Sequence, residues 1–290
     1  MKTVLMYGVL LGAAAASGLT AEEGIFSYPV GRFEVFMLVE NQGQGRSSLL
    51  IGADARDIER YVPGGTYQSE TNTFLIRTGE KNILVDTGFG GAVFDHLKAL
   101  GVDPAQVDAV LLTHLHGDHI GGLQKGGKPL FPRATVYLAQ EEREAWASSA
   151  NTVAALAPYG DRVVTFRPGE LGAAAVELLP GITPIAAFGH TPGHTLYLVQ
   201  SGTERLLIWG DLMHVQGIQF PRPGVSVTYD TDPAAAAAIR TRVLEYAARN
   251  RIPIGGMHLV YPAIGTVTPQ DGGYRLIPPS PLRDNGPGRD

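Results

Sequence analysis

The chain of 290 residues contains no cysteine. It therefore forms no disulfide and offers no thiolate, either as a metal ligand or as a nucleophile. It also lacks any tract of one charge sign, and its formal net charge is only -5. This balance argues against a nucleic-acid surface, which is normally basic. Internal repeats and long low-complexity linkers are absent too, and 44% hydrophobic residues suit one large domain with a substantial core.

A long apolar run that could span a membrane is also missing from the sequence. The chain begins with Met1-Lys2, continues with an apolar stretch at residues 4–11, and then has small residues at 12–17. This order is typical of a secretory signal, and the apolar stretch is too short for a membrane span. We therefore expect cleavage near Ala21 and a periplasmic or secreted protein. The alternative is a simple apolar N-terminal helix or strand.

The domain boundaries follow from these observations. We expect residues 1–21 to be a signal peptide and residues 22–278 to form a single domain. The last segment, residues 279–290, is rich in proline and polar residues and is expected to be a loose tail.

Histidine is scarce in the chain but strongly clustered. Three of its eight histidines lie within six positions, in the stretch His114-Leu115-His116-Gly117-Asp118-His119. An apolar run at 107–112, which predicts a buried strand, comes directly before it. Side chains two apart in an extended segment point the same way, so His114 and His116 can share one ion. Asp118 and His119 then face a neighbouring point, and the spacing predicts two adjacent metal ions rather than histidines that only form hydrogen bonds.

Three further segments place possible ligands at the ends of predicted strands. The segment Gly189–Thr195 offers His190 and His194, of which we favour His194 because it directly precedes a strand. Asp211 follows an apolar strand, and its carboxylate could bridge two cations there. His258 ends another strand. Taken singly, each of these residues fits a structural role better than a ligating one. Together they complete two ligand sets: one of His114, His116 and His194, the other of Asp118, His119 and His258, with Asp211 shared.

The order of predicted elements indicates the fold class. The first half alternates strand, helix and strand, and the second half has several strands and a long helix that starts at Asp232-Pro233 and ends near Asn250. Two halves that each finish in helices predict an α+β architecture, with two mixed sheets packed face to face and helices outside. The predicted strands lie at residues 33–39, 72–76, 82–86, 107–112, 134–138, 163–166, 176–179, 183–187, 195–200, 206–209, 254–257 and 274–277; the other predicted helices lie at 92–100 and 140–148.

These motifs resemble those of a known family. The series His-Leu-His-Gly-Asp-His, Gly-His-Thr-Pro-Gly-His, Gly-Asp and Met-His is similar, in order, to the metal motifs of the metallo-β-lactamase superfamily. Further segments look most like its methyl parathion hydrolase-like branch, close to the lactonases: Gly210–Leu212, Ile218–Phe220, His258–Gly265 and Gly273–Arg275. The resemblance implies a four-layer αβ/βα sandwich, two Zn²⁺ ions or other divalent metals, a possible homodimer, and a small-molecule ester, lactone or phosphotriester substrate. It also implies that Asp86 steadies the His-rich loop.

The leading hypothesis is a dinuclear zinc hydrolase in which a hydroxide held between the two metals cleaves an ester or lactone, with Asp118 accepting the nucleophile's proton. His214, three residues beyond Asp211, is a second catalytic candidate that could reach the substrate oxygen, or it could merely hydrogen-bond a loop. The alternatives are phosphotriesterase or β-lactamase activity at the same site, or a non-catalytic protein that binds a metal or ligand.

Overall fold

The structure is a computed structural model that describes residues 24–174 and 176–279. The predicted signal peptide lies outside these residues, as does all but the first residue of the predicted tail. Export, the cleavage site and a homodimer therefore stay predictions. Within the described part of the chain, no helix combines the length and the apolar character that crossing a bilayer requires.

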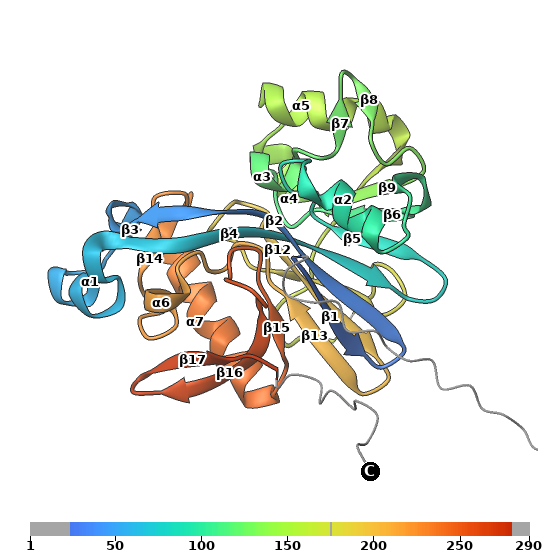
Figure 1. Cartoon of the computed structure of the whole chain (residues 1–290). Coiled ribbons are helices and arrows are strands. Elements are labelled where there is room, and N and C mark those ends of the chain that lie inside the picture. The colour runs from blue at the N-terminus through green and yellow to red at the C-terminus, as the bar shows by residue number, and fades with distance from the viewer. Residues whose placement is uncertain (1–23, 175, 280–290) are drawn as a thin grey trace, which may run out of the picture.

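The first sheet has seven strands and comes from the N-terminal half (Figure 1). Strands β4 (Thr66–Arg77) and β5 (Asn82–Val85) form an antiparallel hairpin across the turn at Thr78 and Lys81. In spatial order the strands are β1 (Ile25–Val30), β2 (Phe33–Arg46), β4 (Thr66–Arg77), β5 (Asn82–Val85), β6 (Ala109–Leu111), β9 (Thr135–Ala139) and β10 (Val163–Phe166).

Alternation along these strands buries both faces of the first sheet. On β4, Phe74 and Ile76 belong to the core shared with the second sheet, whereas Leu75 between them belongs to a separate core under the helices. On β5, Leu84 faces that helix-side core together with Val93 of α2. Because successive strand residues point to opposite faces, such apolar runs are covered on both sides.

The second sheet and the helices complete four layers. The strands of this sheet, in spatial order, are β11 (Ile182–Ala186), β12 (Thr195–Ser201), β13 (Glu204–Ile208), β15 (Ile254–Gly255), β16 (Ile264–Gln270) and β17 (Gly273–Ile277). Helix α7 (Pro233–Asn250) packs on its outer face through Val243, Leu244 and Ala247. Helices α2 (Ala92–Ala99), α4 (Gln140–Ala145) and α5 (Ala150–Leu156) lie on the other side of the molecule (Figure 1). The predicted four-layer sandwich is confirmed.

Helix α7 begins as the sequence predicts. The side chain of Asp232 accepts hydrogen bonds from the backbone N–H groups of Ala234 and Ala235, and Pro233 occupies the first helical position. An aspartate cap of this kind satisfies N–H groups that have no partner within the helix.

A long arm extends from the first sheet. Strands β2 and β4 continue past the sheet as a ribbon that reaches α1 (Ala55–Tyr61), as Figure 1 shows. The pair β3 (Leu50–Ile51) and β14 (Ser226–Val227) ties the end of this arm to the loop before α7. The short elements α3 (Gly117–Ile120), α6 (Gln216–Gln219), β7 (Gln124–Lys125) and β8 (Lys128–Pro129), with 3-10 turns at Ser47–Leu49, Pro63–Gly65, Pro104–Gln106 and Ala157–Arg162, fill the connections.

One predicted strand is wrong. The structure assigns no strand to residues 176–179; only Leu179 forms an isolated bridge, with Ile182. Val176 is 76% exposed, so the segment lacks the buried face that a strand in this fold would need.

Candidate metal centre

A buried carboxylate fixes the His-rich loop after β6. Asp86 is fully buried, and its two oxygens accept hydrogen bonds from the backbone N–H of Thr113 (2.8 Å) and from the hydroxyl of Thr113 (2.7 Å). The same carboxylate lies 2.7 Å from Nδ1 of His119. Because a carboxylate only accepts, Nδ1 of His119 carries the proton and its Nε2 is free to bind a metal. This geometry supports the role that the resemblance implied for Asp86.

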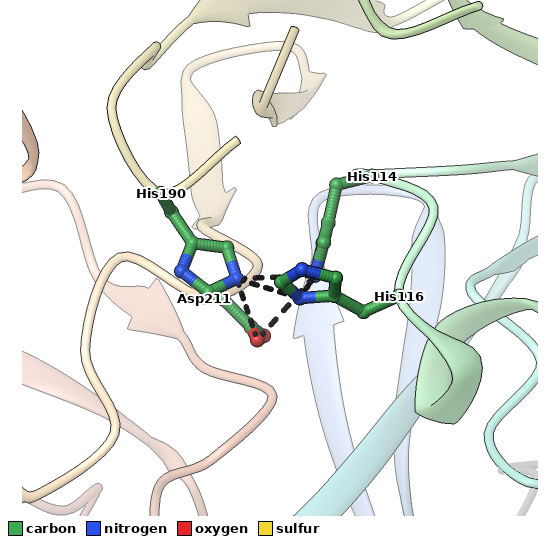
Figure 2. A group of neighbouring side chains, drawn as sticks. All are labelled: His114, His116, His190 and Asp211. Carbon is green, nitrogen blue, oxygen red and sulfur yellow. Dashed lines mark hydrogen bonds and ion pairs between the residues drawn. The ribbon is translucent and has the colours of Figure 1, made fainter. Parts of the chain in front are cut away.

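A first group of donors comes from both halves of the chain. His114 and His116 on the loop after β6 face His190, on the loop between β11 and β12, and Asp211, which follows β13 (Figure 2). Nε2 of His190 lies 3.2 Å from Nε2 of His114 and 3.1 Å from Nδ1 of His116, and these last two nitrogens are 3.0 Å apart. Asp211 Oδ2 lies 3.3 Å from Nε2 of His190. Three imidazole nitrogens and one carboxylate oxygen therefore converge on one point.

At this group the structure differs from the ligand set expected from the sequence, because it contains His190 in place of His194. The ring of His194 is buried, but its Nε2 accepts a hydrogen bond from the backbone N–H of Asp211 (3.0 Å) and its Nδ1 lies 3.1 Å from the carbonyl of Ala187. Both nitrogens are thus occupied by the backbone. Gly210, at φ 55°, permits this approach, since a Cβ there would collide with the His194 ring.

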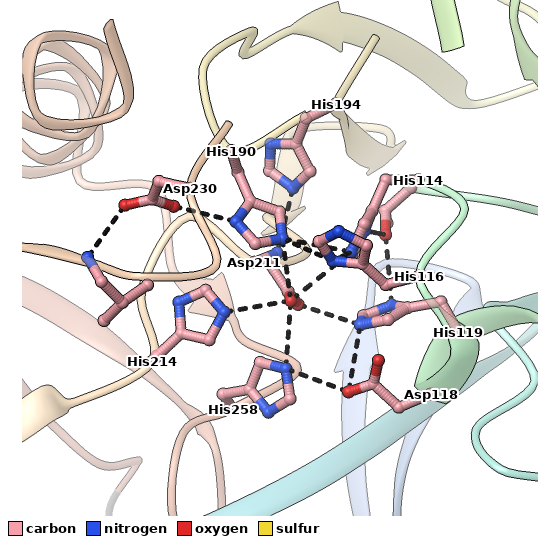
Figure 3. Close-up of polar contacts among 12 residues, drawn as sticks. His114, His116, Asp118, His119, His190, His194, Asp211, His214, Asp230 and His258 are labelled. Atoms are coloured by element: carbon pink, nitrogen blue, oxygen red, sulfur yellow. Dashed lines mark hydrogen bonds and ion pairs between the residues drawn. The ribbon is translucent and has the colours of Figure 1, made fainter. Parts of the chain in front are cut away.

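A second group of donors lies beside the first and shares Asp211 with it. Asp118 and His119 of the His-rich loop meet His258, which follows β15 (Figure 3). Nε2 of His119 lies 3.1 Å from Asp211 Oδ1, and Nε2 of His258 lies 3.1 Å from Asp211 Oδ2. Asp118 Oδ2 is 3.5 Å from Nε2 of His258. The predicted second set and the shared position of Asp211 match this arrangement.

The arrangement of these donor atoms suits binding of divalent metal ions better than hydrogen bonding among the side chains themselves. His119 Nε2 and Asp211 Oδ1 are buried and have no hydrogen-bond partner, although they are only 3.1 Å apart. The nitrogens of His114, His116 and His190 each lie near both others, yet one N–H can point at only one of them. The nitrogen–nitrogen separations of 3.0 to 3.2 Å are close to the distance between two ligand atoms in a tetrahedral zinc site, which is about 3.3 Å for zinc–nitrogen bonds of about 2.0 Å.

The electrostatics of the centre favour positive charge around Asp211. Burial would lower the pKa of His190, but hydrogen bonds to Asp211 and Asp230 outweigh burial and raise it to about 9. Burial would likewise raise the pKa of Asp211, yet His119, His258 and other histidines hold it well below its usual value. Asp211 therefore remains an anion that attracts a cation, which protons or metal ions can supply.

Two supporting carboxylates were not among the residues selected from the sequence. Asp230 lies 2.9 Å from Nδ1 of His190 and orients that ring, while the buried guanidinium of Arg240 on α7 stands 3.7 Å from Asp230. Glu142 on α4 accepts hydrogen bonds from the N–H groups of Leu115 (3.0 Å) and Gly193 (2.8 Å). It therefore joins the His-rich loop to the loop that carries His190. No local motif distinguishes either residue, because both meet their partners only through the fold.

His214 lies beside the second group rather than apart from it. Its Nε2 is 3.2 Å from Asp211 Oδ2, and its ring stacks on that of His258 at 4.8 Å between centroids. Burial lowers the pKa of His214 to about 4, so the ring is neutral at pH 7. The side chain of Gln219 holds this segment by accepting hydrogen bonds from the N–H groups of His214 and Val215.

A cleft of about 620 Å³ opens in front of the centre. Its floor contains the exposed edges of both donor groups and its walls come from the β2–β4 arm, the loop after β5 and the loop before α7. The lining residues include His116, Asp118, Asp211, His214 and His258, together with the aromatic residues Tyr67, Phe89 and Tyr229.

Comparison with known proteins identifies the family. The model of the metallo-beta-lactamase superfamily matches residues 66–250, which is most of the chain. The chain belongs to this superfamily.

Solved structures agree with this assignment. Hydrolase AbOPH in the beta lactamase superfamily is 30% identical, with a TM-score of 0.81 over 89% of this chain and 98% of that one. AidC, a dizinc quorum-quenching lactonase solved with a product, shares the fold, with a TM-score of 0.79, 24% identity and coverage of 90% and 99%.

Curated relatives match only a short part of the chain. An atrochrysone carboxyl ACP thioesterase of Aspergillus chevalieri is 43% identical over 63 residues, which are 21% of this chain and 20% of the relative. A thioesterase of the same description from Passalora fulva is 46% identical over 66 residues. The chain thus spans about a fifth of the length of these relatives.

Proposed function

We propose that the protein is a dinuclear zinc hydrolase that cleaves an ester or lactone. The observation that carries this proposal is the pair of adjacent donor groups on one shared carboxylate, Asp211, at the floor of an open cleft. The descriptions of two similar proteins, a dizinc lactonase and a thioesterase, support hydrolysis of an acyl bond.

Seven residues would hold the two ions. His114, His116 and His190 suit one, Asp118, His119 and His258 suit the other, and Asp211 suits both. Zinc ions bound there would lower the pKa of water toward about 7 and polarise the scissile carbonyl. Other divalent metals accept the same nitrogen and oxygen donors.

Other side chains at the centre would transfer a proton and orient the metal ligands. Asp118 is 23% exposed, and of the carboxylates among the proposed ligands it is the one that reaches solvent, so it is placed to take a proton from the attacking water and pass it to the leaving alkoxide. Asp86 and Asp230 hold the rings of His119 and His190 with their Nε2 atoms turned inward.

The experiment that tests this function begins with elemental analysis of the purified protein. We expect about two zinc ions per chain and hydrolysis of a lactone or ester that chelation abolishes and zinc restores. Paraoxon and nitrocefin, assayed with the same sample, test the phosphotriesterase and β-lactamase alternatives. Two bound metals without turnover on a broad ester and lactone panel would instead indicate a non-catalytic binding protein.

We also propose that His214 donates a hydrogen bond to the substrate oxygen. Its ring lines the cleft beside His258 and is neutral at pH 7, so its single N–H lies on Nε2, 3.2 Å from Asp211 Oδ2. Metal ions bound to Asp211 would free this N–H for the substrate. Replacing His214 with alanine is then expected to lower kcat by about 10- to 100-fold while two zinc ions stay bound. Unchanged turnover in the zinc-loaded variant would dispose of this role.

A further inference from the structure

Three aromatic residues line the cleft. Tyr67 comes from β4, Phe89 from the loop after β5 and Tyr229 from the loop before α7. Phe89 is 56% exposed and Tyr229 is 51% exposed. The Tyr229 ring lies 5.9 Å from that of His214, measured between centroids. Aromatic surface is therefore open directly beside the metal-binding residues.

A glycine holds the ring of Tyr67 in place. Gly45 on β2 lies directly opposite Tyr67 on β4, and the far end of the Tyr67 ring occupies the space that a Cβ at residue 45 would need. Tyr67 also packs against the small core of Val62, Val215, Ile218, Val225 and Val227 under the arm. The ring is thus fixed between the strand and this core, as a flat wall of the cleft.

A second glycine on the same face of β2 gives a natural comparison. Gly43 lies opposite Ser69, two residues from Gly45 on the same strand, and a Cβ there would meet no atom within 4 Å. Neither glycine has a positive φ, so the backbone tolerates alanine at both positions. Alanine at residue 45 must displace Tyr67, whereas alanine at residue 43 displaces nothing.

We propose that Tyr67, seated on Gly45, is a specificity-determining residue that binds a flat aromatic group of the substrate, with Tyr229 as a second aromatic ring of the same cleft. This inference rests on the proposed ester or lactone hydrolysis and names a class of substrate for it. Burial raises the pKa of Tyr67 and the nearby Tyr229 adds to the shift, which agrees with two phenols close together in the cleft. Two aromatic rings at one opening favour a planar ligand, because offset and edge-to-face ring pairs contribute about 0.5–1.5 kcal/mol beyond area burial.

The test compares esters of similar reactivity with and without a ring. Benzyl acetate carries the ring on the alcohol side, ethyl phenylacetate carries it on the acyl side, and ethyl acetate lacks it. For the zinc-loaded wild type we expect kcat/KM to be about tenfold higher for at least one aromatic ester than for ethyl acetate. Gly45→Ala is expected to remove most of this preference by raising KM for the aromatic ester. Gly43→Ala is expected to keep the preference. Tyr67→Phe, which retains the ring, is expected to keep it as well. Zinc content and thermal unfolding establish that each variant is folded.

The inference is overturned if Gly45→Ala and Gly43→Ala have the same ester preference, or if Gly45→Ala lowers all three kcat/KM values equally. Calorimetric binding of phenylacetate against acetate provides a second readout that does not need turnover. If the wild type hydrolyses no ester but binds phenylacetate more tightly, and only Gly45→Ala loses that difference, the proposed function fails and the aromatic site stands. Equal binding of both acids by all variants would overturn the aromatic site.

Discussion

The two histidines His190 and His194 have different partners, so the loss of each ring has a different consequence. Nε2 of His190 belongs to the first donor group, whereas both nitrogens of His194 meet backbone groups. We expect His190→Ala to lower the zinc content from about two ions to about one, because one site loses a ligand. His194→Ala should keep both ions but lower the free energy of unfolding by about 2–5 kcal/mol, through a cavity and an unpaired N–H. Elemental analysis and urea unfolding of both variants check this, and the reverse pattern would restore His194 as the ligand.

Asp230 is expected to act on metal affinity through His190. Asp230→Asn keeps the shape of the side chain but weakens the acceptor that orients the His190 ring. We expect zinc affinity to fall by about 10- to 100-fold, as measured by competition with a chelator. Asp232→Asn, two residues away at the start of α7, is the matched control, since asparagine also caps helices and the hydrogen bonds of the Asp232 side chain are with Ala234 and Ala235. Equal affinities in the two variants would contradict the role of Asp230.

Most residues of the centre could be found from the sequence because their spacing carries geometric information. His114, His116, Asp118 and His119 sit in one short loop, so any compact conformation brings them together. The choice between His190 and His194 could not be made in this way. It depends on the backbone N–H of Asp211, which reaches His194 from the loop after β13.

Among the larger elements, α4 connects the two loops that carry the first donor group. Its Glu142 is buried and accepts an N–H from each loop. In Glu142→Gln one of these N–H groups loses its acceptor, so we expect the free energy of unfolding to fall by about 1–3 kcal/mol and zinc to bind more weakly. Glu144→Gln on the exposed side of the same helix should change stability by less than about 0.5 kcal/mol. Denaturant titrations of both variants provide the measurement, and equal stabilities would argue against the connection.

The helices and strands differ in how well their own sequences predict them. The start of helix α7 was predicted to the residue because its cap, its proline and its alanine run agree. Strand β2 was expected to stop at Val39, yet it continues to Arg46 through a polar, glycine-containing segment. Pairing with β4 resumes after an irregularity between Val39 and Asn41. That extension is stabilised by its partner strand and not by its own pattern, so periodicity could not reveal it.

For the whole molecule, the centre lies where the two sheets meet. His114, His116, Asp118 and His119 follow a strand of the first sheet, whereas His190, Asp211 and His258 lie on loops of the second. Bound ions would therefore crosslink the two halves. We expect zinc at 100 times its Kd to stabilise the fold by about 2.7 kcal/mol per site, and chelation to reverse this. Thermal unfolding with and without zinc checks the effect, with Ca²⁺ as a control that prefers oxygen ligands. Identical curves would show that no ion bridges the halves.

The neighbouring residues Tyr229 and Asp230 share one short loop, although one lines the cleft and the other supports His190. Laboratory evolution that shortens or remodels this loop to admit new substrates would also disturb the ring of His190. Variants selected for altered preference at residues 228–231 should then require more zinc in the growth medium, whereas changes at Gly45 or Tyr67 on the β2–β4 arm should not raise the zinc requirement.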